Sequence, residues 1–113
     1  MCTAVRIVVL APTRERQLAL RRAAIGEAWQ VVAAVGDVEA AIDRLTTLRG
    51  KVVVVDGAGT GEVVVRLRRA APDVLLVGIG EVAGTDAVVD ADALDRLPEV
   101  LARVLHAKGD HTH

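Results

Sequence analysis

The stretch VVVVDGAGTGE, residues 52–62, decides the fold. Its four consecutive valines are typical of a strand that is buried on both faces of a parallel sheet. Asp56 ends the valine run, and glycines follow at Gly57, Gly59 and Gly61. The stretch therefore predicts a turn from a central strand into a helix, with a single carboxylate at the end of the strand.

Valine-rich segments alternate with longer segments of helical periodicity along the rest of the chain, which indicates βαβ units and the α/β class. The expected strands are residues 6–10, 29–35, 51–55, 74–79 and 87–89. The expected helices are residues 14–27, the segment between Asp37 and Gly50, residues 61–71, and a last helix that starts near Pro98. A chain of 113 residues has the size of one domain, so residues 1–113 are interpreted as a single unit, with 109–113 as a disordered tail.

The link between the last two expected strands is short. About seven residues, Gly80 to Asp86, separate them, whereas a parallel crossover normally contains about a dozen residues or more and usually a helix. We therefore expect the fourth helix to be missing or shortened. The orientation of strand 87–89 stays open, and an antiparallel arrangement is one alternative.

Charge and cysteine usage limit the expected partners and location. A formal charge of −1, with both signs interspersed, gives no electrostatic reason to expect nucleic acid or an anionic membrane. No apolar run approaches the length of a membrane helix. The single cysteine, Cys2, cannot form an internal disulfide, and no secretory signal opens the chain, so we expect a cytoplasmic protein.

Over nearly its whole length the chain resembles the receiver domain of bacterial response regulators. The resemblance rests on four segments: VVAAVGDVEAAIDRL (31–45), KVVVVD (51–56), VVVRLRRAAPDVLLV (63–77) and GTDAVVDADALDRLPEVLARVL (84–105). It implies a flavodoxin-like, doubly wound and mostly parallel sheet of five strands in the order 2-1-3-4-5. It also implies that Asp56 stands at the position of the phosphoacceptor aspartate.

The other working positions of the receiver family fall on residues that lack the required groups. The acidic pair that holds the divalent ion, the hydroxyl residue, the aromatic residue and the lysine correspond to Ala11-Pro12, Gly78, Val88 and Ala91, respectively. A divalent ion prefers several oxygen ligands, and Asp56 alone supplies too few. Asp90 and Asp92 come from a neighbouring strand end, but carboxylates alone do not recreate the site. The hypothesis is therefore a pseudo-receiver that binds no metal or cofactor, performs no catalysis and does not depend on aspartyl phosphorylation.

The glycines allow an alternative. Residues 52–81 also resemble the first nucleotide-binding motif of Rossmann-like methyltransferases, in which Gly57, Gly59 and Gly61 would approach S-adenosylmethionine and Glu81 would bind the ribose. The acidic residue that normally precedes the glycines by two positions is replaced by Val55, and too few strands follow. A small nucleotide-binding or S-adenosylmethionine-binding domain stays as the second hypothesis. Asp56 can also act only as a cap of the turn.

A receiver-like fold without its switch can still bind proteins, so we expect a regulatory interaction module. The expected surface for a protein partner or a homodimer comprises Val88, Val89, Val100 and Leu101. The arginines at positions 21, 22, 66 and 69 are interpreted as solvated faces. No metal site is expected at His106, His111 and His113, because two of them lie in the tail.

Overall fold

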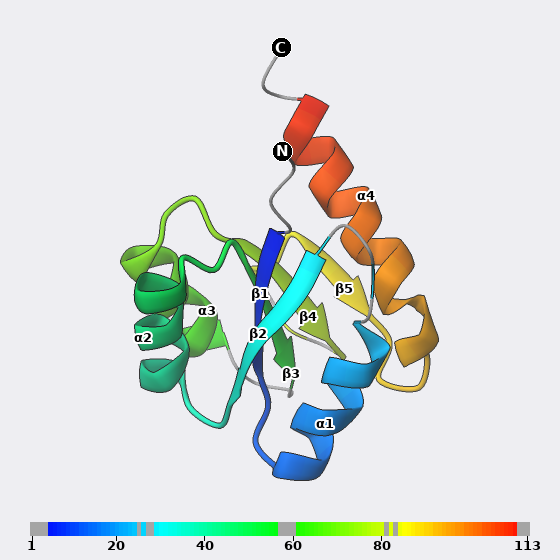
Figure 1. The fold of residues 1–113 in the computed structure, drawn as a ribbon, viewed down its shortest axis with the longest axis horizontal. Coiled ribbons are helices and arrows are strands. Elements are labelled where there is room, and N and C mark those ends of the chain that lie inside the picture. The colour runs from blue at the N-terminus through cyan, green and yellow to red at the C-terminus, as the bar shows by residue number, and fades with distance from the viewer. Residues whose placement is uncertain are drawn as a thin grey trace.

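The computed structural model describes residues 5–24, 26, 29–56, 61–80, 82 and 84–110. The strands are β1 (Val5–Leu10), β2 (Trp29–Val35), β3 (Val52–Asp56), β4 (Leu75–Ile79) and β5 (Ala87–Val89). The helices are α1 (Arg14–Ala23), α2 (Val38–Leu48), α3 (Gly61–Ala70) and α4 (Leu97–Asp110), with a short 3₁₀ helix, η1 (Leu94–Arg96), before α4. Strands and helices alternate as the sequence predicted (Figure 1).

The five strands form one sheet in the order β2-β1-β3-β4-β5, and every neighbouring pair is parallel. This confirms the predicted order. The orientation of β5, which the sequence left open, is parallel to β4: Val77 pairs with Ala87 and Ile79 with Val89. All strands therefore end at the same edge of the sheet, and Asp56 lies at that edge.

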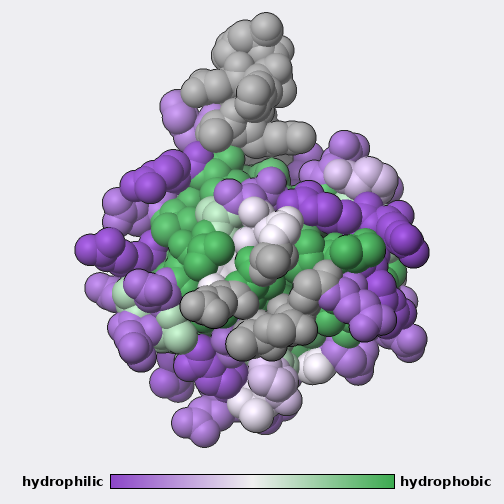
Figure 2. Space-filling model, turned by 180° about the vertical axis from the view of Figure 1, so that it is seen from behind, coloured by the Kyte–Doolittle hydropathy of each residue, from purple (hydrophilic) through white to green (hydrophobic). Residues whose placement is uncertain are grey.

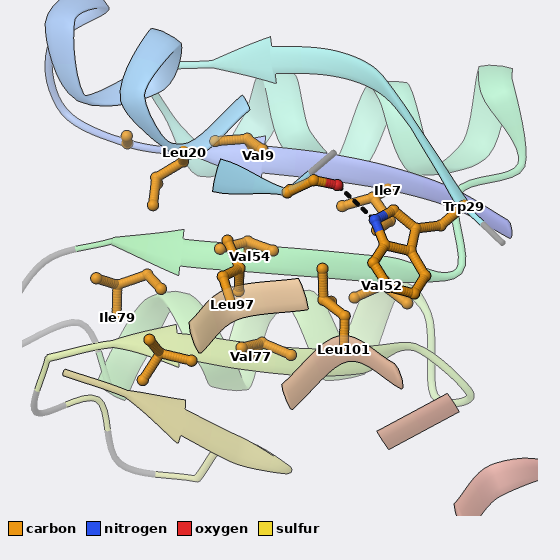
Figure 3. Close-up of a cluster of buried hydrophobic side chains, with 13 residues drawn as sticks. Ile7, Val9, Leu20, Trp29, Val52, Val54, Val77, Ile79, Leu97 and Leu101 are labelled. Atoms are coloured by element: carbon orange, nitrogen blue, oxygen red, sulfur yellow. Dashed lines mark hydrogen bonds between the residues drawn. The ribbon is translucent and has the colours of Figure 1, made fainter. Parts of the chain in front are cut away.

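Helices cover both faces of the sheet, with α1 and α4 on one side and α2 and α3 on the other (Figure 1). The valines of β3 divide between the two layers. Val52 and Val54 pack in the core under α1 and α4, together with Leu20 and Leu101 (Figure 3). Val53 and Val55 pack in the opposite core under α2 and α3. All four valines are completely buried, as the unbroken apolar run predicted.

Local signals explain where the first two helices begin. Thr13 and Asp37 are extended residues whose side-chain oxygens accept hydrogen bonds from the backbone N–H groups of Arg16 and Ala40. Such N-caps satisfy donors that have no partner within the helix. At the other end α1 is shorter than the predicted 14–27, because the chain leaves the helix at Ala24. There the carbonyl accepts a hydrogen bond from the indole N–H of Trp29 (Figure 3).

The last helix is longer than the sequence suggested. α4 continues to Asp110, so the first two residues of the segment expected to be a disordered tail, Gly109 and Asp110, are helical; residues 111–113 lie outside the described residues. Within the described ranges, no helix has both the length and the apolar composition needed to cross a membrane.

Between β4 and β5, a short connection takes the place of the helix that usually links two parallel strands. Its described residues, 80, 82 and 84–86, contain no helix, in agreement with the prediction. Val82 takes over part of the packing, because it is buried in the core under α2 and α3 with 4% of its surface exposed. It lies directly on β4: a Cβ added to Gly78 would come within 2.7 Å of the Cβ of Val82.

An arginine on α3 holds this connection in place. The guanidinium of Arg68 donates to the carbonyl of Gly84 at 2.8 Å and to the carboxylate of Asp86 at 3.3 Å. The same carboxylate oxygen accepts a hydrogen bond of 2.8 Å from the backbone N–H of Leu76 on β4. Arg68 and Asp86 thus join α3, the connection and β4 through one small polar cluster.

Candidate functional site

The candidate site is the carboxylate of Asp56 at the carboxyl end of β3. Along this strand Asp56 continues the alternation of Val52 and Val54, whose side chains face the α1 and α4 layer. The carboxylate therefore points toward the beginning of α1 rather than toward α2. Only 9% of the side chain is exposed, so a charge in this position needs a partner.

Arg16 supplies that partner. Its Nε donates to Oδ2 of Asp56 at 2.8 Å, and its Nη2 donates to Oδ1 at 3.2 Å. Both carboxylate oxygens thus accept from one guanidinium, which is the bidentate geometry that makes arginine–carboxylate pairs strong and well oriented. The Thr13 cap helps to fix the donor, because it holds the backbone N–H of Arg16 in the first turn of α1.

The guanidinium of Arg16 stays charged over the whole physiological range. The hydrogen bond to Asp56 is the main reason why the pKa of Arg16 lies above its usual value. Burial acts in the opposite direction, and the negative charges of Asp56 and Glu15 raise the pKa further. Because the folded-state pKa is raised, the stability that this charge contributes is present at every pH below the usual pKa of arginine. It is lost only as the solution becomes more alkaline than that.

The surroundings of Asp56 offer little to a divalent ion. Ala11, which follows β1, is buried, and its backbone carbonyl already accepts a hydrogen bond of 3.1 Å from Gln17. Asp90 and Asp92 are exposed after β5, and the described residues contain no group of three acidic, histidine or cysteine side chains that could hold a metal ion. The carboxylate of Asp56 is thus the partner of a cation from the protein itself.

A small cavity lies beside Asp56. It measures about 130 Å³ and is lined mainly by aliphatic side chains, among them Leu10, Val38 and Val55. Pockets that bind drug-sized ligands measure about 300–1,000 Å³. Of the residues in the nucleotide-binding hypothesis, Gly61 is the first residue of α3, whereas Gly57, Gly59 and Glu81 lie outside the described residues. No described feature favours that hypothesis.

The residues that the resemblance assigns to the other working positions of receiver domains carry no reactive side chain. Gly78 is buried and has no space for a hydroxyl side chain, because Val82 lies against it. Val88 is 53% exposed on β5, and Ala91 is exposed just after it.

The predicted interaction surface needs a correction. Val89 and Leu101 have 2% and 0% of their surfaces exposed, and both pack in the core against the sheet. The apolar character of these two residues reflects their burial in the core, so they cannot form part of an interaction surface. Val100 is partly buried against the same core, which leaves Val88 as the exposed member of the set.

The remaining candidates have ordinary surroundings. Arg66 forms an exposed ion pair of 3.4 Å with Glu39 of α2, and Arg21, Arg22 and Arg69 are exposed. His106 is exposed on α4; His111, His113 and Cys2 lie outside the described residues.

Sequence analysis missed Arg16, the residue that defines the site. It did so because the contact joins positions 40 apart in the sequence. One local signal was present: Arg14 and Arg16 both lie in the first turn of α1, where the helix dipole disfavours cations. A cation in such a place needs a nearby carboxylate.

Comparisons with known proteins identify the fold. No protein-family model matches the chain, and no curated protein matches it in sequence. Among solved structures, the chain is similar to the REC domain of AraT, a response regulator from Geobacillus stearothermophilus. The two are 18% identical with a TM-score of 0.78, and the match covers 98% of this chain and 100% of that one.

Two other structures give the same result. The response regulator domain of Thermotoga maritima CheB is 15% identical with a TM-score of 0.73, and the match covers 93% of this chain and 96% of that chain. The RcsB response regulator of Salmonella typhimurium is 16% identical with a TM-score of 0.77, and the match covers 92% of this chain but only 61% of the RcsB chain. The chain therefore has the fold of response-regulator receiver domains.

Proposed function

We propose that the chain is a receiver-like signalling module that regulates a protein partner without aspartyl phosphorylation. The observation that supports this most directly is the bidentate pair between Arg16 and Asp56, with N–O distances of 2.8 and 3.2 Å. Transfer of a phosphoryl group to Asp56 requires a free carboxylate oxygen as nucleophile and a divalent ion to neutralise the phosphoryl oxygens. In this protein a guanidinium occupies both oxygens.

Opening the pair would not make the site competent. Release of Arg16 would leave a carboxylate that is 9% exposed without a partner, which is costly. A divalent ion that entered instead would find Ala11 and Pro12 in place of acidic ligands. The module therefore holds Asp56 in one paired state, and its output does not follow the phosphorylation state.

We propose a protein partner or a second copy as the binding partner, and no catalysis, cofactor, membrane or direct nucleic-acid contact. RcsB has been described as two dimers bound to two parallel DNAs, and this chain spans 65% of that RcsB chain. A net charge of −1 gives this domain no electrostatic attraction to DNA of its own. The proposed location remains the cytoplasm.

The proposed partner surface lies beside the short β4–β5 connection. Val88 on β5 and Val65 on α3 have 53% and 50% of their surfaces exposed, which is unusual for large aliphatic side chains in this protein. Figure 2 shows hydrophobic residues in the middle of the face seen from behind, with hydrophilic residues around them. An apolar centre with a polar rim is typical of protein interfaces.

Phosphorylation can be tested directly. The protein is incubated with Mg²⁺ and acetyl phosphate, and its intact mass is measured at intervals; a receiver domain of known activity serves as the positive control. We expect no increase of about 80 Da, the mass of one phosphoryl group. An adduct of that mass that is absent from the Asp56→Asn variant would overturn the proposal.

A further inference from the structure

A second concave site lies at the amino ends of the strands, opposite the carboxyl ends where Asp56 lies. A pocket of about 840 Å³, open to solvent, is lined by the amino ends of β1 and β4, the links that lead into β3 and β4, and the carboxyl-terminal half of α4. In Figure 1 this is the edge toward which the end of α4 extends. The volume lies in the range of small-molecule sites, about 300–1,000 Å³, and is several times that of the cavity beside Asp56.

The floor and walls of this pocket are aliphatic. Val5 and Leu75 come from the strand ends, Val74 from the link before β4 and Leu105 from α4, and Ala71 and Pro72 complete the lining. Val74 is 5% exposed, whereas Leu75 and Leu105 are half-buried and present part of their surface to the pocket. A ligand here would remove apolar surface from water.

Two cations stand on one side of the pocket. Arg49 and Lys51 belong to the link between α2 and β3, and both are exposed. Neither side chain forms an ion pair or a hydrogen bond with another described residue. Asp73 lies on the link before β4 and also lines the pocket, so two positive charges and one negative charge leave the lining with one net positive charge.

The backbone at Arg49 makes its presence notable. Arg49 ends α2 with φ 56° and ψ 46°, a left-handed conformation in which glycine is favoured. A Cβ on the adjacent Gly50 would fit tightly, 3.0 Å from the side chain of Leu45 and 3.1 Å from that of Val8. The left-handed conformation favours glycine at position 49, so the presence of arginine is explained if its guanidinium binds a ligand. The simplest competing explanation is that Arg49 only balances the negative end of the α2 dipole.

We propose that this pocket binds a small amphiphilic anion, a carboxylate or phosphate ester attached to an apolar body. Arg49 and Lys51 would hold the anionic group, and the apolar body would cover Val5, Leu75 and Leu105. The charge of the lining and the chemistry of the walls both fit this class. The site is separate from Asp56, so its test does not depend on the phosphorylation state of the protein.

Binding is tested with three probes that share one apolar body and differ in charge: octanoate, octanol and octylammonium. Each is titrated at millimolar concentration into the isotope-labelled full chain, and backbone amide shifts are followed by two-dimensional NMR. We expect octanoate to shift the amides of Val5, Gly50, Lys51 and Leu75 and to leave Asp56 unchanged. It should bind about tenfold more tightly than the other two probes, the effect expected of one charge-assisted hydrogen bond.

Variants then separate binding from folding. Arg49→Gly removes a cation but relieves the left-handed backbone, so its melting temperature should equal or exceed that of the parent while the affinity for octanoate falls about fivefold to tenfold. Lys51→Gln should weaken binding similarly. Arg44→Gln, which removes an exposed cation of α2 outside the pocket, should leave binding unchanged.

Four results would overturn the proposal. These are the absence of amide shifts with octanoate, shifts confined to other surfaces, equal affinity for octanol, and an unchanged affinity in both pocket variants. Sedimentation with vesicles of phosphatidylglycerol provides a further test. If the protein sediments with vesicles but does not bind free octanoate, the cations serve a membrane surface and the small-molecule assignment is wrong.

Discussion

At the scale of single residues, the contact between Arg16 and Asp56 determines what the carboxylate can do. The aspartate was prominent in the sequence because it follows an unbroken valine run, whereas the arginine was not, because its partner is 40 positions away. Sequence reasoning therefore identified the acceptor and not the donor. The same applies to Val89 and Leu101, whose apolar character is equally consistent with a core and with a surface; only their burial decides.

The energy of this pair can be measured in a double-mutant cycle. Arg16→Met leaves a largely buried carboxylate without its partner and should lower the free energy of unfolding by about 2 kcal/mol, between the values for exposed and buried pairs, since Arg16 is 35% exposed. Adding Asp56→Asn should recover most of this loss. Urea unfolding followed by circular dichroism gives all four values. A double variant whose loss equals the sum of the two single losses would show that the pair contributes nothing.

A second prediction concerns Gly78, the residue that the resemblance assigns to the hydroxyl position of receiver domains. Gly78→Ser should not restore any activity but should destabilise the fold by about 1–3 kcal/mol, because its Cβ would meet Val82 at 2.7 Å. In a Val82→Gly background, which lacks this Cβ, the loss caused by Gly78→Ser should be smaller than in the parent. Thermal unfolding of the three variants measures this. A fully stable Gly78→Ser protein would contradict the close approach.

At the scale of elements, the sequence was most reliable for strands and least reliable for helix ends. The predicted strands 29–35 and 87–89 coincide with β2 and β5, because a short apolar run is a local property of the sequence. α1 ends at Ala23 instead of 27, because a tertiary contact between Trp29 and Ala24 ends it. The absence of a helix among the described residues between β4 and β5 was predictable from the short length of the segment 80–86. The roles of Val82 and Arg68 in the connection were not, because both act through distant contacts.

The role of Arg68 in the β4–β5 connection gives a prediction at this scale. In Arg68→Ala the carbonyl of Gly84 and the carboxylate of Asp86 lose their shared donor. Hydrogen exchange should accelerate at residues 84–86 and at the amide of Leu76, which donates to Asp86. Arg69→Ala, an exposed neighbour on the same helix, is the matched control. Identical exchange in both variants would mean that the cluster does not hold the connection.

At the scale of the whole molecule, the two edges of the sheet differ in chemistry. The edge at the carboxyl ends of the strands holds Asp56 in an internal ion pair, while the opposite edge holds the large apolar pocket with Arg49 and Lys51. Between them, the face beside β5 presents exposed valines. Under the proposed function, in which Asp56 is not phosphorylated, the domain would retain two surfaces on which a signal can act.

Self-association tests the apolar face. If a second copy docks on it, Val88→Lys should convert dimer to monomer in sedimentation equilibrium, since a desolvated charge at an interface without a partner opposes association. Leu18→Lys is the control, because Leu18 is a similarly exposed aliphatic residue, at 45%, on α1. A parent protein that remains monomeric at all concentrations would exclude the homodimer and leave a different protein as the partner.

The buried Trp29 has a practical consequence for all of these measurements. The chain contains one tryptophan and no tyrosine or phenylalanine, so its entire ultraviolet emission comes from a single indole. Trp29 is 9% exposed, and its indole N–H donates a hydrogen bond to the carbonyl of Ala24 at the end of α1. Its fluorescence should shift to longer wavelength when this contact opens. The protein therefore carries its own optical reporter, and no label has to be introduced.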